Sequence, residues 1–181
     1  MIELLDIFDQ HGNPTGRTEE KVRAHDLGLW HRAAHILVMN SQGELLMQLR
    51  AACKTLLPNW WDPFVGGHIS AGETYAQGAV RELNEELGID IPESELKKLF
   101  SYKYARNELL DINPLEHDEI FLVNLDLPID RFVMAEEEVA QLKYMPWRKL
   151  VAMSDEELYA NKIIPHPYIK NLGKYLEAAC P

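Results

Sequence analysis

The spacing of hydrophobic residues divides the chain into segments with the period of strands and segments with the period of helices. Alternating hydrophobic and polar positions, and short apolar runs bounded by turn residues, predict strands. The expected strands cover residues 2–7, 33–39, 45–49, 99–104, 119–125 and 142–147. Turn residues between 9 and 16 end the first strand, and a loop is expected from 51 to about 64.

Helical spacing replaces this alternation in three places. Between Thr74 and Leu87 one apolar stripe recurs every three or four positions, and Gly88 is suited to end the helix. In the tail, Ser154 and Glu157 form a capping-box pattern, and apolar residues of segment 169–179 share one side of a further helix. Strands interleaved with a few helices predict a mixed α/β fold.

Length and charge limit the class of protein. No repeat or linker interrupts the 181 residues, so a single domain spanning 1–181 is expected. The net charge of −11 argues against binding a nucleic acid polymer or a membrane, although a bound cation would still admit a small phosphorylated substrate. The start of the chain lacks the features of a signal peptide, and Cys53 and Cys180 have no metal or redox spacing. A cytoplasmic location is therefore expected.

Candidate chemistry is concentrated between Gly67 and Ile89. On a helix, Glu82, Glu85 and Glu86 stand at positions i, i+3 and i+4, so their carboxylates share one face. Such a cluster destabilises a bare helix and is best explained by a bound divalent cation. Oxygen ligands of this kind suit Mg²⁺ or Mn²⁺ better than Zn²⁺. The alternative is a solvated acidic face that binds nothing.

A larger pattern decides between these alternatives. Segment 67–89 resembles the Nudix box, in which fixed intervals separate one glycine, a glutamate, an Arg-Glu pair, a Glu-Glu pair and a final glycine. The match holds at every specified position, namely Gly67, Glu73, Arg81, Glu82, Leu83, Glu85, Glu86, Gly88 and Ile89. A chance match in such a chain is on the order of one in ten million or rarer. The chain is therefore identified as a member of the Nudix superfamily.

The resemblance implies an α/β/α sandwich with a mixed β-sheet and hydrolysis of a diphosphate linkage in a nucleotide-type or other small phosphorylated metabolite. The implied metal ligands, for Mg²⁺ or Mn²⁺, are Gly67, Glu82, Glu85 and Glu86. The implied catalytic residues are Glu73, Arg81, Glu82 and Glu85. Either Glu82 or Glu85 would orient or deprotonate the attacking water, while Glu73 and Arg81 would support the cluster. Dimers are frequent in the family, so the resemblance allows a homodimer, but the sequence leaves the oligomeric state open.

A second resemblance extends over most of the chain. It rests on residues 29–32, 44–50, Lys54, Pro58, Trp61 and 67–68, which look like type I isopentenyl-diphosphate isomerase and its hydrolase-like relatives. It implies that Arg50 and Lys54 contact the diphosphate. Trp60 and Trp61 could stack on the substrate, with one of them expected in the core, and Trp61 is taken as the substrate contact. The isomerase has a further metal site, at positions matching His25, His31, His68 and Glu119. The three histidines could equally have structural or substrate-contact roles, and Glu119 could serve as a metal ligand or a base.

Two departures from the isomerase favour a hydrolase. Gly66 stands at the position of the isomerase's catalytic cysteine, and Cys53 lies too far before it to substitute. The box is also intact, whereas bacterial isomerases carry an arginine near the position of Glu82. We therefore expect a Mg²⁺-dependent Nudix hydrolase, with an isomerase and a non-catalytic nucleotide sensor as the alternatives. The acidic run 136–138 is interpreted as a solvated turn.

Overall fold

The computed structural model describes residues 2–179. The strands are β1 (Leu4–Phe8), β2 (Pro14–Glu20), β3 (His31–Met39), β4 (Glu44–Arg50), β5 (Trp61–Asp62), β6 (Val65–His68), β7 (Lys97–Tyr104), β8 (Glu116–Asn124) and β9 (Val139–Pro146). The α-helices are α1 (Lys21–Asp26), α2 (Tyr75–Leu87), α3 (Trp147–Ala152), α4 (Asp155–Ala160) and α5 (Ile169–Ala179). Short 3₁₀ turns occur at Glu93–Glu95 and Ile129–Arg131.

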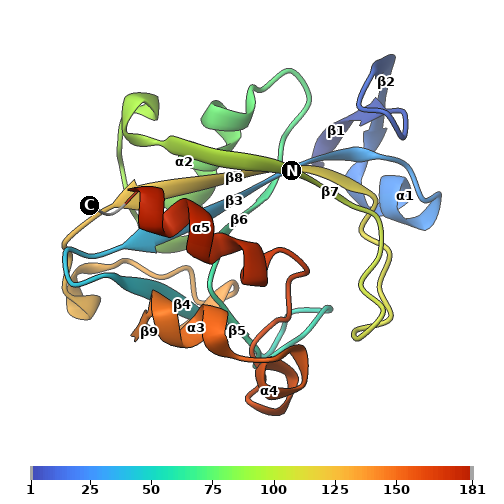
Figure 1. The fold of residues 1–181 in the computed structure, drawn as a ribbon. Coiled ribbons are helices and arrows are strands. Elements are labelled where there is room, and N and C mark those ends of the chain that lie inside the picture. The colour runs from blue at the N-terminus through green and yellow to red at the C-terminus, as the bar shows by residue number, and fades with distance from the viewer. Residues whose placement is uncertain (1, 180–181) are drawn as a thin grey trace.

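One mixed sheet forms the centre of the molecule (Figure 1). Its main path runs β5-β4-β3-β8-β7, with β6 also paired to β3 and β9 to β4. Strand β3 is parallel to β8 and antiparallel to β4 and β6. The hairpin β1-β2 forms a separate two-stranded sheet. The expected mixed sheet is thus confirmed.

Helices cover both faces of the central sheet. On one face, Ala79, Leu83 and Leu87 of α2 pack with Phe121 and Val123 of β8. On the other face, Ile120 and Leu122 of the same strand pack with apolar residues of α3, α4 and α5. Because successive strand residues point to opposite faces, β8 divides its side chains between the two layers. This arrangement is the α/β/α sandwich that the sequence implied.

Five short strands and helices were not expected from the sequence, among them the four-residue strand β6 (Val65–His68), which follows the predicted loop. The interval 9–16 is not all turn, since β2 begins at Pro14, and the loop 51–64 contains the two-residue strand β5. Strand β2 is almost wholly exposed and polar, so it lacks the alternation that reveals a strand. Helices α1 and α3 have six residues each, too few for a helical period to stand out.

The described residues 2–179 include no helix that is both long enough and apolar enough to cross a membrane. Cys180 lies outside the described residues, and Cys53 is exposed with a free thiol.

Candidate active site

Local sequence determines where the box helix begins and ends. The Thr74 side chain accepts a hydrogen bond from the backbone N–H of Gln77, whose side chain accepts one from the Thr74 N–H in return. Gly88 ends the helix in the left-handed conformation, with φ of 65°. The apolar stripe packs on the sheet, so the adjoining acidic positions face the loop that precedes the helix. The predicted helix and its stop at Gly88 are confirmed.

Arg81 joins the carboxylates of the box. Its guanidinium donates to Glu73 Oε1 at 3.0 Å, to Glu82 Oε1 at 2.7 Å and to Glu85 Oε2 at 2.9 Å. It also donates to the backbone carbonyl of His68 at 2.9 Å, which ties the helix to the preceding loop. Burial alone would raise the pKa of Glu73, but the hydrogen bonds and charge of Arg81 hold it below its usual value. Arg81 therefore fixes the orientation of these acidic side chains.

Two of the three clustered glutamates are enclosed and the third is open to solvent. Glu86 is only 7% exposed, and its Oε2 atom has no hydrogen-bond partner among residues 2–179. Burial, together with the negative charge of Glu82, raises the pKa of Glu86 to about 8. The Glu82 side chain is 13% exposed and that of Glu85 is 58% exposed. A buried carboxylate oxygen without a partner, beside a second carboxylate, suits a hard divalent cation.

Gly67 lies directly against this cluster. A Cβ atom at this position would come within 2.9 Å of Glu82 Oε1, so a larger residue would require the carboxylate of Glu82 to shift. Strand β6 holds Gly67 in register with Ala34 of β3. The backbone is therefore close enough to the glutamates for a shared ligand, as the box resemblance implied.

The three expected substrate contacts lie at the end of β4, in the loop after it and in β5. Arg50 donates through Nε and Nη2 to the carbonyl of Leu56, and its charge helps to lower the pKa of Asp62 against the effect of burial. Lys54 forms an ion pair with Glu138. The Trp61 ring is half-buried, and Lys143 Nζ lies 3.6 Å from its centroid. One face of the Trp61 ring is therefore already covered.

Glu138 and Gln48 are polar neighbours of the box that sequence reasoning missed. The negative charge of Glu138 contributes to the raised pKa of Glu86, and the Gln48 side chain lies beside Glu86. Gln48 is buried in β4 and donates to the carbonyl of Phe64 at 2.7 Å. The run 136–138 is therefore more than a solvated turn. A polar residue inside an apolar strand was the available signal for Gln48.

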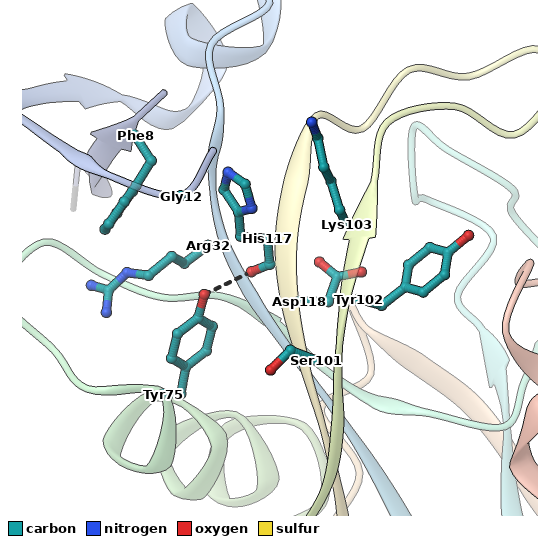
Figure 2. Close-up of a pocket in the computed structure, with 9 residues that line it drawn as sticks. All are labelled: Phe8, Gly12, Arg32, Tyr75, Ser101, Tyr102, Lys103, His117 and Asp118. Atoms are coloured by element: carbon teal, nitrogen blue, oxygen red, sulfur yellow. Dashed lines mark hydrogen bonds between the residues drawn. The ribbon is translucent and has the colours of Figure 1, made fainter. Parts of the chain in front are cut away.

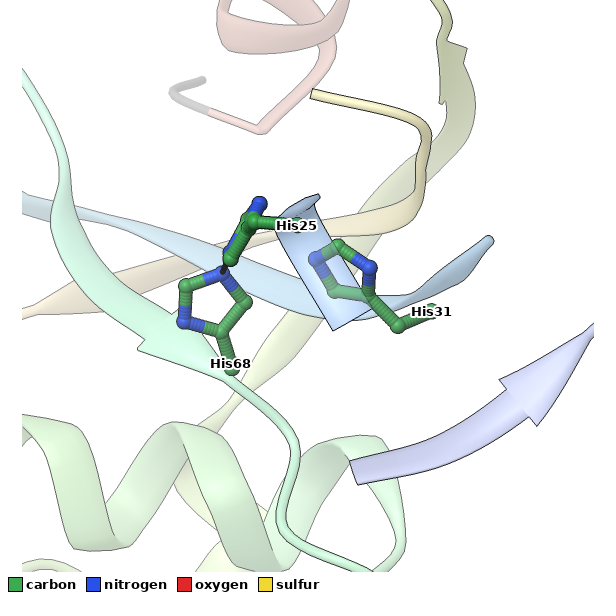
Figure 3. A group of neighbouring side chains, drawn as sticks. All are labelled: His25, His31 and His68. Carbon is green, nitrogen blue, oxygen red and sulfur yellow. Dashed lines mark hydrogen bonds between the residues drawn. The ribbon is translucent and has the colours of Figure 1, made fainter. Parts of the chain in front are cut away.

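Three histidines expected from the isomerase resemblance lie together (Figure 3). The ligand nitrogens of His25, His31 and His68 lie within 4.8 Å of one another. His31 Nδ1 lies 2.8 Å from the carbonyl oxygen of Leu29 and donates its proton to that oxygen, while the other ring nitrogen, Nε2, is buried. That buried Nε2 has no hydrogen-bond partner in the described part of the chain. The group could hold a metal ion.

The carboxylate beside these histidines is Glu116, and not Glu119. Glu116 Oε1 lies 3.6 Å from Nε2 of His31 and 3.6 Å from Nε2 of His68. Glu119 instead accepts a hydrogen bond from Lys98 at 2.5 Å. In the sequence, the four consecutive polar residues Glu116 to Glu119 gave no reason to choose one carboxylate over the other. In β8, successive side chains point to opposite faces of the sheet, so Glu116 and Glu119 lie on different faces.

A second region of interest lies at the N-terminal end of α2 (Figure 2). A pocket of about 480 Å³ is lined by Phe8, Arg32, Tyr75, Lys103 and His117, among others. The Tyr75 hydroxyl donates to the carbonyl of His117 at 2.9 Å. None of the site residues expected from the sequence lines this pocket.

Gly66 has a backbone conformation that excludes a side chain. Its φ is 140°, and a Cβ atom there would overlap the carbonyl oxygen of Ala34. The position that matches the isomerase's cysteine is therefore closed by the main chain, as well as lacking a thiol.

Comparisons with known proteins agree with this fold and box. A family model described as NUDIX domain matches residues 29–166. Nudix hydrolase 3 of Arabidopsis thaliana is 34% identical over 152 residues, which cover 81% of this chain and only 20% of that protein. Isopentenyl-diphosphate Delta-isomerase 2 of Photorhabdus laumondii is 34% identical over 153 residues, covering 84% of this chain and 82% of that protein. The crystal structure of DR0079 from Deinococcus radiodurans matches with a TM-score of 0.72 at 22% identity, covering 95% of this chain and 98% of that one.

The sandwich and the complete box define the class as a Nudix domain. The chain belongs to the Nudix hydrolase family, on a branch that also contains proteins named isopentenyl-diphosphate isomerase.

Proposed function

We propose that this chain hydrolyses the P–O–P linkage of a small phosphorylated metabolite, with Mg²⁺ or Mn²⁺ held by Glu82, Glu85, Glu86 and the carbonyl of Gly67. The observation that carries the proposal is the enclosed Glu86 oxygen without a partner, next to Glu82. When bound, the metal lowers the pKa of water and neutralises the diphosphate. The homodimer and the cytoplasmic location stay predictions.

The chain's own residues position the reacting groups. Arg81 orients Glu82 and Glu85 through a single guanidinium nitrogen, Nη1. Glu85 is the more exposed of the two, so solvent and substrate reach it first. Either carboxylate can accept the proton of the attacking water, and the choice between them stays open. Arg50 and Lys54 are proposed to contact the diphosphate, with Lys54 released from Glu138 when substrate binds.

Isomerisation of an allylic diphosphate is the less well supported alternative. That reaction needs one group to add a proton at carbon and another to remove a proton. Gly66 offers no such group, and its conformation leaves no room for one. We therefore predict no interconversion of isopentenyl and dimethylallyl diphosphates. Detecting it by NMR at enzyme-like turnover would support the isomerase alternative instead.

The test is a panel of nucleoside diphosphate derivatives, sugar nucleotides and isoprenoid diphosphates, incubated with Mg²⁺, with Mn²⁺ and with chelator. Hydrolysis is expected only with metal, and the products should be two phosphate-bearing fragments or a phosphomonoester with orthophosphate or pyrophosphate. Binding without cleavage of any compound would favour a nucleotide sensor.

A further inference from the structure

The pocket of Figure 2 lies on the face of the sheet that α2 covers, at the edge formed by β7 and β8. Lys103 of β7 is paired with His117 of β8, so the two side chains share a face. Successive strand residues alternate, and His117 therefore lies on the same face as Phe121, which packs with α2. A volume of about 480 Å³ is that of a site for a small organic molecule.

Basic side chains outnumber acidic ones in this pocket. Arg32, Lys103 and His117 belong to its lining, and Asp118 is the only acidic residue among the described residues that line it. Asp118 is 1% exposed, so its carboxylate is enclosed and not presented to a ligand. The whole chain has a net charge of −11, which makes this local excess of basic groups unusual. Such a lining attracts an anion.

Lys103 has no acidic partner in the described part of the chain. Its Nζ atom lies 4.6 Å from the centroid of the Trp30 ring, and none of the ion pairs within residues 2–179 includes it. On the same strand, Lys98 is instead paired with Glu119. An aromatic ring attracts an ammonium group without neutralising its charge. Lys103 is therefore held at the pocket with its charge available to an anion.

Arg32 is fixed in place and still has donors to spare. Its Nη2 atom donates to the carbonyl of Glu73 at 2.8 Å and to Asp6 Oδ2 at 3.3 Å. Its Cζ atom lies 5.2 Å from the ring centroids of both Phe8 and Tyr75. The buried Nε atom has no hydrogen-bond partner within residues 2–179. A guanidinium group carries five N–H donors, so an anion in the pocket finds a donor group already oriented.

The remainder of the lining suits a flat ring. Aromatic side chains supply most of it, namely Phe8, Tyr75, Tyr102 and His117. The rings of Phe8 and His117 meet edge to face, with centroids 6.4 Å apart. An inorganic anion would contact the basic groups and leave most of the volume unused, whereas a planar organic body can pack against these rings.

We propose that this pocket binds a small organic anion composed of a planar ring and a phosphate or carboxylate group, with the anionic group held by Lys103 and Arg32. The site is separate from the box and goes beyond the proposed function. Tyr75 precedes Glu82 by seven residues and Glu86 by eleven, which is about 10 Å and about 16 Å along a helix. Binding at this site requires no metal ion.

The test is titration calorimetry in the presence of chelator, so that no metal at the box can recruit a phosphate. Phenyl phosphate and benzoate are the probes, and cyclohexyl phosphate is the control with the same charge and no planar ring. One phenyl phosphate or benzoate is expected per chain, and the tighter of the two identifies the anionic group. Cyclohexyl phosphate should bind more weakly than phenyl phosphate. Absence of binding by both ring anions would overturn the proposal.

Lys103→Gln tests the basic group, with Lys97→Gln as its matched control. Both lysines are exposed residues of β7, but Lys97 is paired with Leu122 and lies on the other face of the sheet. Lys103→Gln should weaken phenyl phosphate binding about tenfold, because a hydrogen bond between charged groups is lost. Lys97→Gln should bind like wild type. Equal losses in the two variants would contradict a specific site.

Two further measurements locate the ligand and separate this proposal from the proposed function. Glu85→Gln should keep phenyl phosphate binding while it loses hydrolysis. Phe8→Leu keeps an apolar side chain without a ring, so its preference for phenyl over cyclohexyl phosphate should shrink. Crystals soaked in phenyl phosphate should show the ligand between Lys103 and Arg32. Circular dichroism checks the fold of each variant, and ligand density only at the box would overturn the proposal.

Discussion

Two groups of carboxylates lie on opposite faces of one sheet and differ in how their charge is compensated. In the box, Arg81 donates to Glu73, Glu82 and Glu85 before any metal binds. On the other face lies the group of His35, Glu116 and Asp118, called here the inner cluster, and among the ion pairs of residues 2–179 no lysine or arginine reaches its two carboxylates. The box is therefore partly neutralised by an arginine and open to solvent at Glu85, whereas the carboxylates of the inner cluster are enclosed and have no such cationic partner within residues 2–179. The charge of the box is thus offset by a side chain of the protein itself, whereas burial and the charge of Glu116 raise the pKa of Asp118, so that a proton can neutralise this carboxyl group.

The largest expected effect comes from Glu85→Gln in the box. The change keeps the shape of the side chain and removes one charge, so the affinity for Mg²⁺ should fall. Turnover should fall by a factor on the order of a hundred or more, because the metal supplies several kcal/mol of transition-state stabilisation. Initial rates at saturating Mg²⁺ on the best substrate of the panel measure this loss.

Glu177→Gln is the matched control for this change. Glu177 is also an exposed helical glutamate with an arginine partner, its side chain being 62% exposed and ion-paired with Arg148. It lies on α5, away from the box, so the rate should stay that of wild type. Equal rates for both variants would mean that the acidic cluster is only a solvated surface.

Gly66→Cys should destabilise the protein and should not create an isomerase. The new Cβ would collide with the carbonyl of Ala34 in the middle of the β3-β6 pair, and the backbone would have to shift. Overpacking and backbone strain of this kind cost about 1–3 kcal/mol of unfolding free energy. Urea denaturation measures the loss, and NMR of isopentenyl diphosphate checks for isomerisation.

The control for Gly66→Cys is Gly173→Ala in α5. A Cβ at Gly173 would lie 3.8 Å from Trp147, an ordinary contact, and alanine favours a helix. This variant should gain about 0.5–1 kcal/mol of unfolding free energy. If Gly66→Cys were as stable as wild type, the backbone at the position of the isomerase's cysteine would accept a side chain, contrary to the collision with Ala34.

The same comparison explains how far the sequence could predict each site. The box lies within one continuous segment, so a spacing of i, i+3 and i+4 was enough to place Glu82, Glu85 and Glu86 on one helix face. The inner cluster is assembled from β3, β8 and the segment before α5, and nothing local relates His35 to Asp118 or Tyr168. Pairing of β3 with β8 creates it, and no single-sequence period reports such pairing.

The secondary structure also divides into elements that the sequence predicted and elements that it did not. Strands β3 and β8 and helix α2 were predictable because their apolar positions follow a period and turn residues bound them. Strand β2 is polar and exposed and is defined by its pairing with β1, so its sequence has no alternation of apolar and polar residues that would predict a strand. The contact of Lys54 with Glu138 joins positions far apart in the chain, so the acidic run 136–138 gave no sign of it.

The pH dependence of the unfolding free energy should show whether Glu86 carries a proton in the folded protein, and Glu86→Gln is the variant that tests this. In chelator, the folded protein keeps a proton on Glu86 up to about pH 8, whereas the unfolded chain loses it near the ordinary value of 4.5. Between these values the folded state binds the extra proton, so unfolding free energy falls as pH rises, by about 1.4 kcal/mol per unit at most. The glutamine variant has no such proton, and its advantage over wild type should grow from about pH 5 to about pH 8.

Urea midpoints of wild type and Glu86→Gln across that pH range measure the difference. Burial and the charge of Glu116 also raise the pKa of Asp118. Asp118 therefore lowers the unfolding free energy as pH rises in both proteins. Only the difference between the two proteins therefore reports Glu86. A constant difference over the whole range would show that Glu86 is already ionised in the folded chain. Mg²⁺ should bind wild type more tightly as pH rises over the same interval, because binding displaces that proton.

The smallest expected effect is that of Glu85→Gln on the stability of the metal-free protein. Spacing alone predicts that relief of repulsion stabilises the variant by roughly 0.2–1 kcal/mol. The structure shows an opposing loss, because Glu85 accepts a hydrogen bond from Arg81 at 2.9 Å on an exposed helix surface. Exposed pairs at this spacing contribute about 0.3–0.5 kcal/mol, so the two effects largely cancel, and the unfolding free energy in chelator should change by less than about 0.5 kcal/mol. Added Mg²⁺ should then raise the melting temperature of wild type more than that of the variant. A variant much more stable than wild type in chelator would mean that Arg81 does not neutralise the box, and the contrast with the inner cluster would disappear.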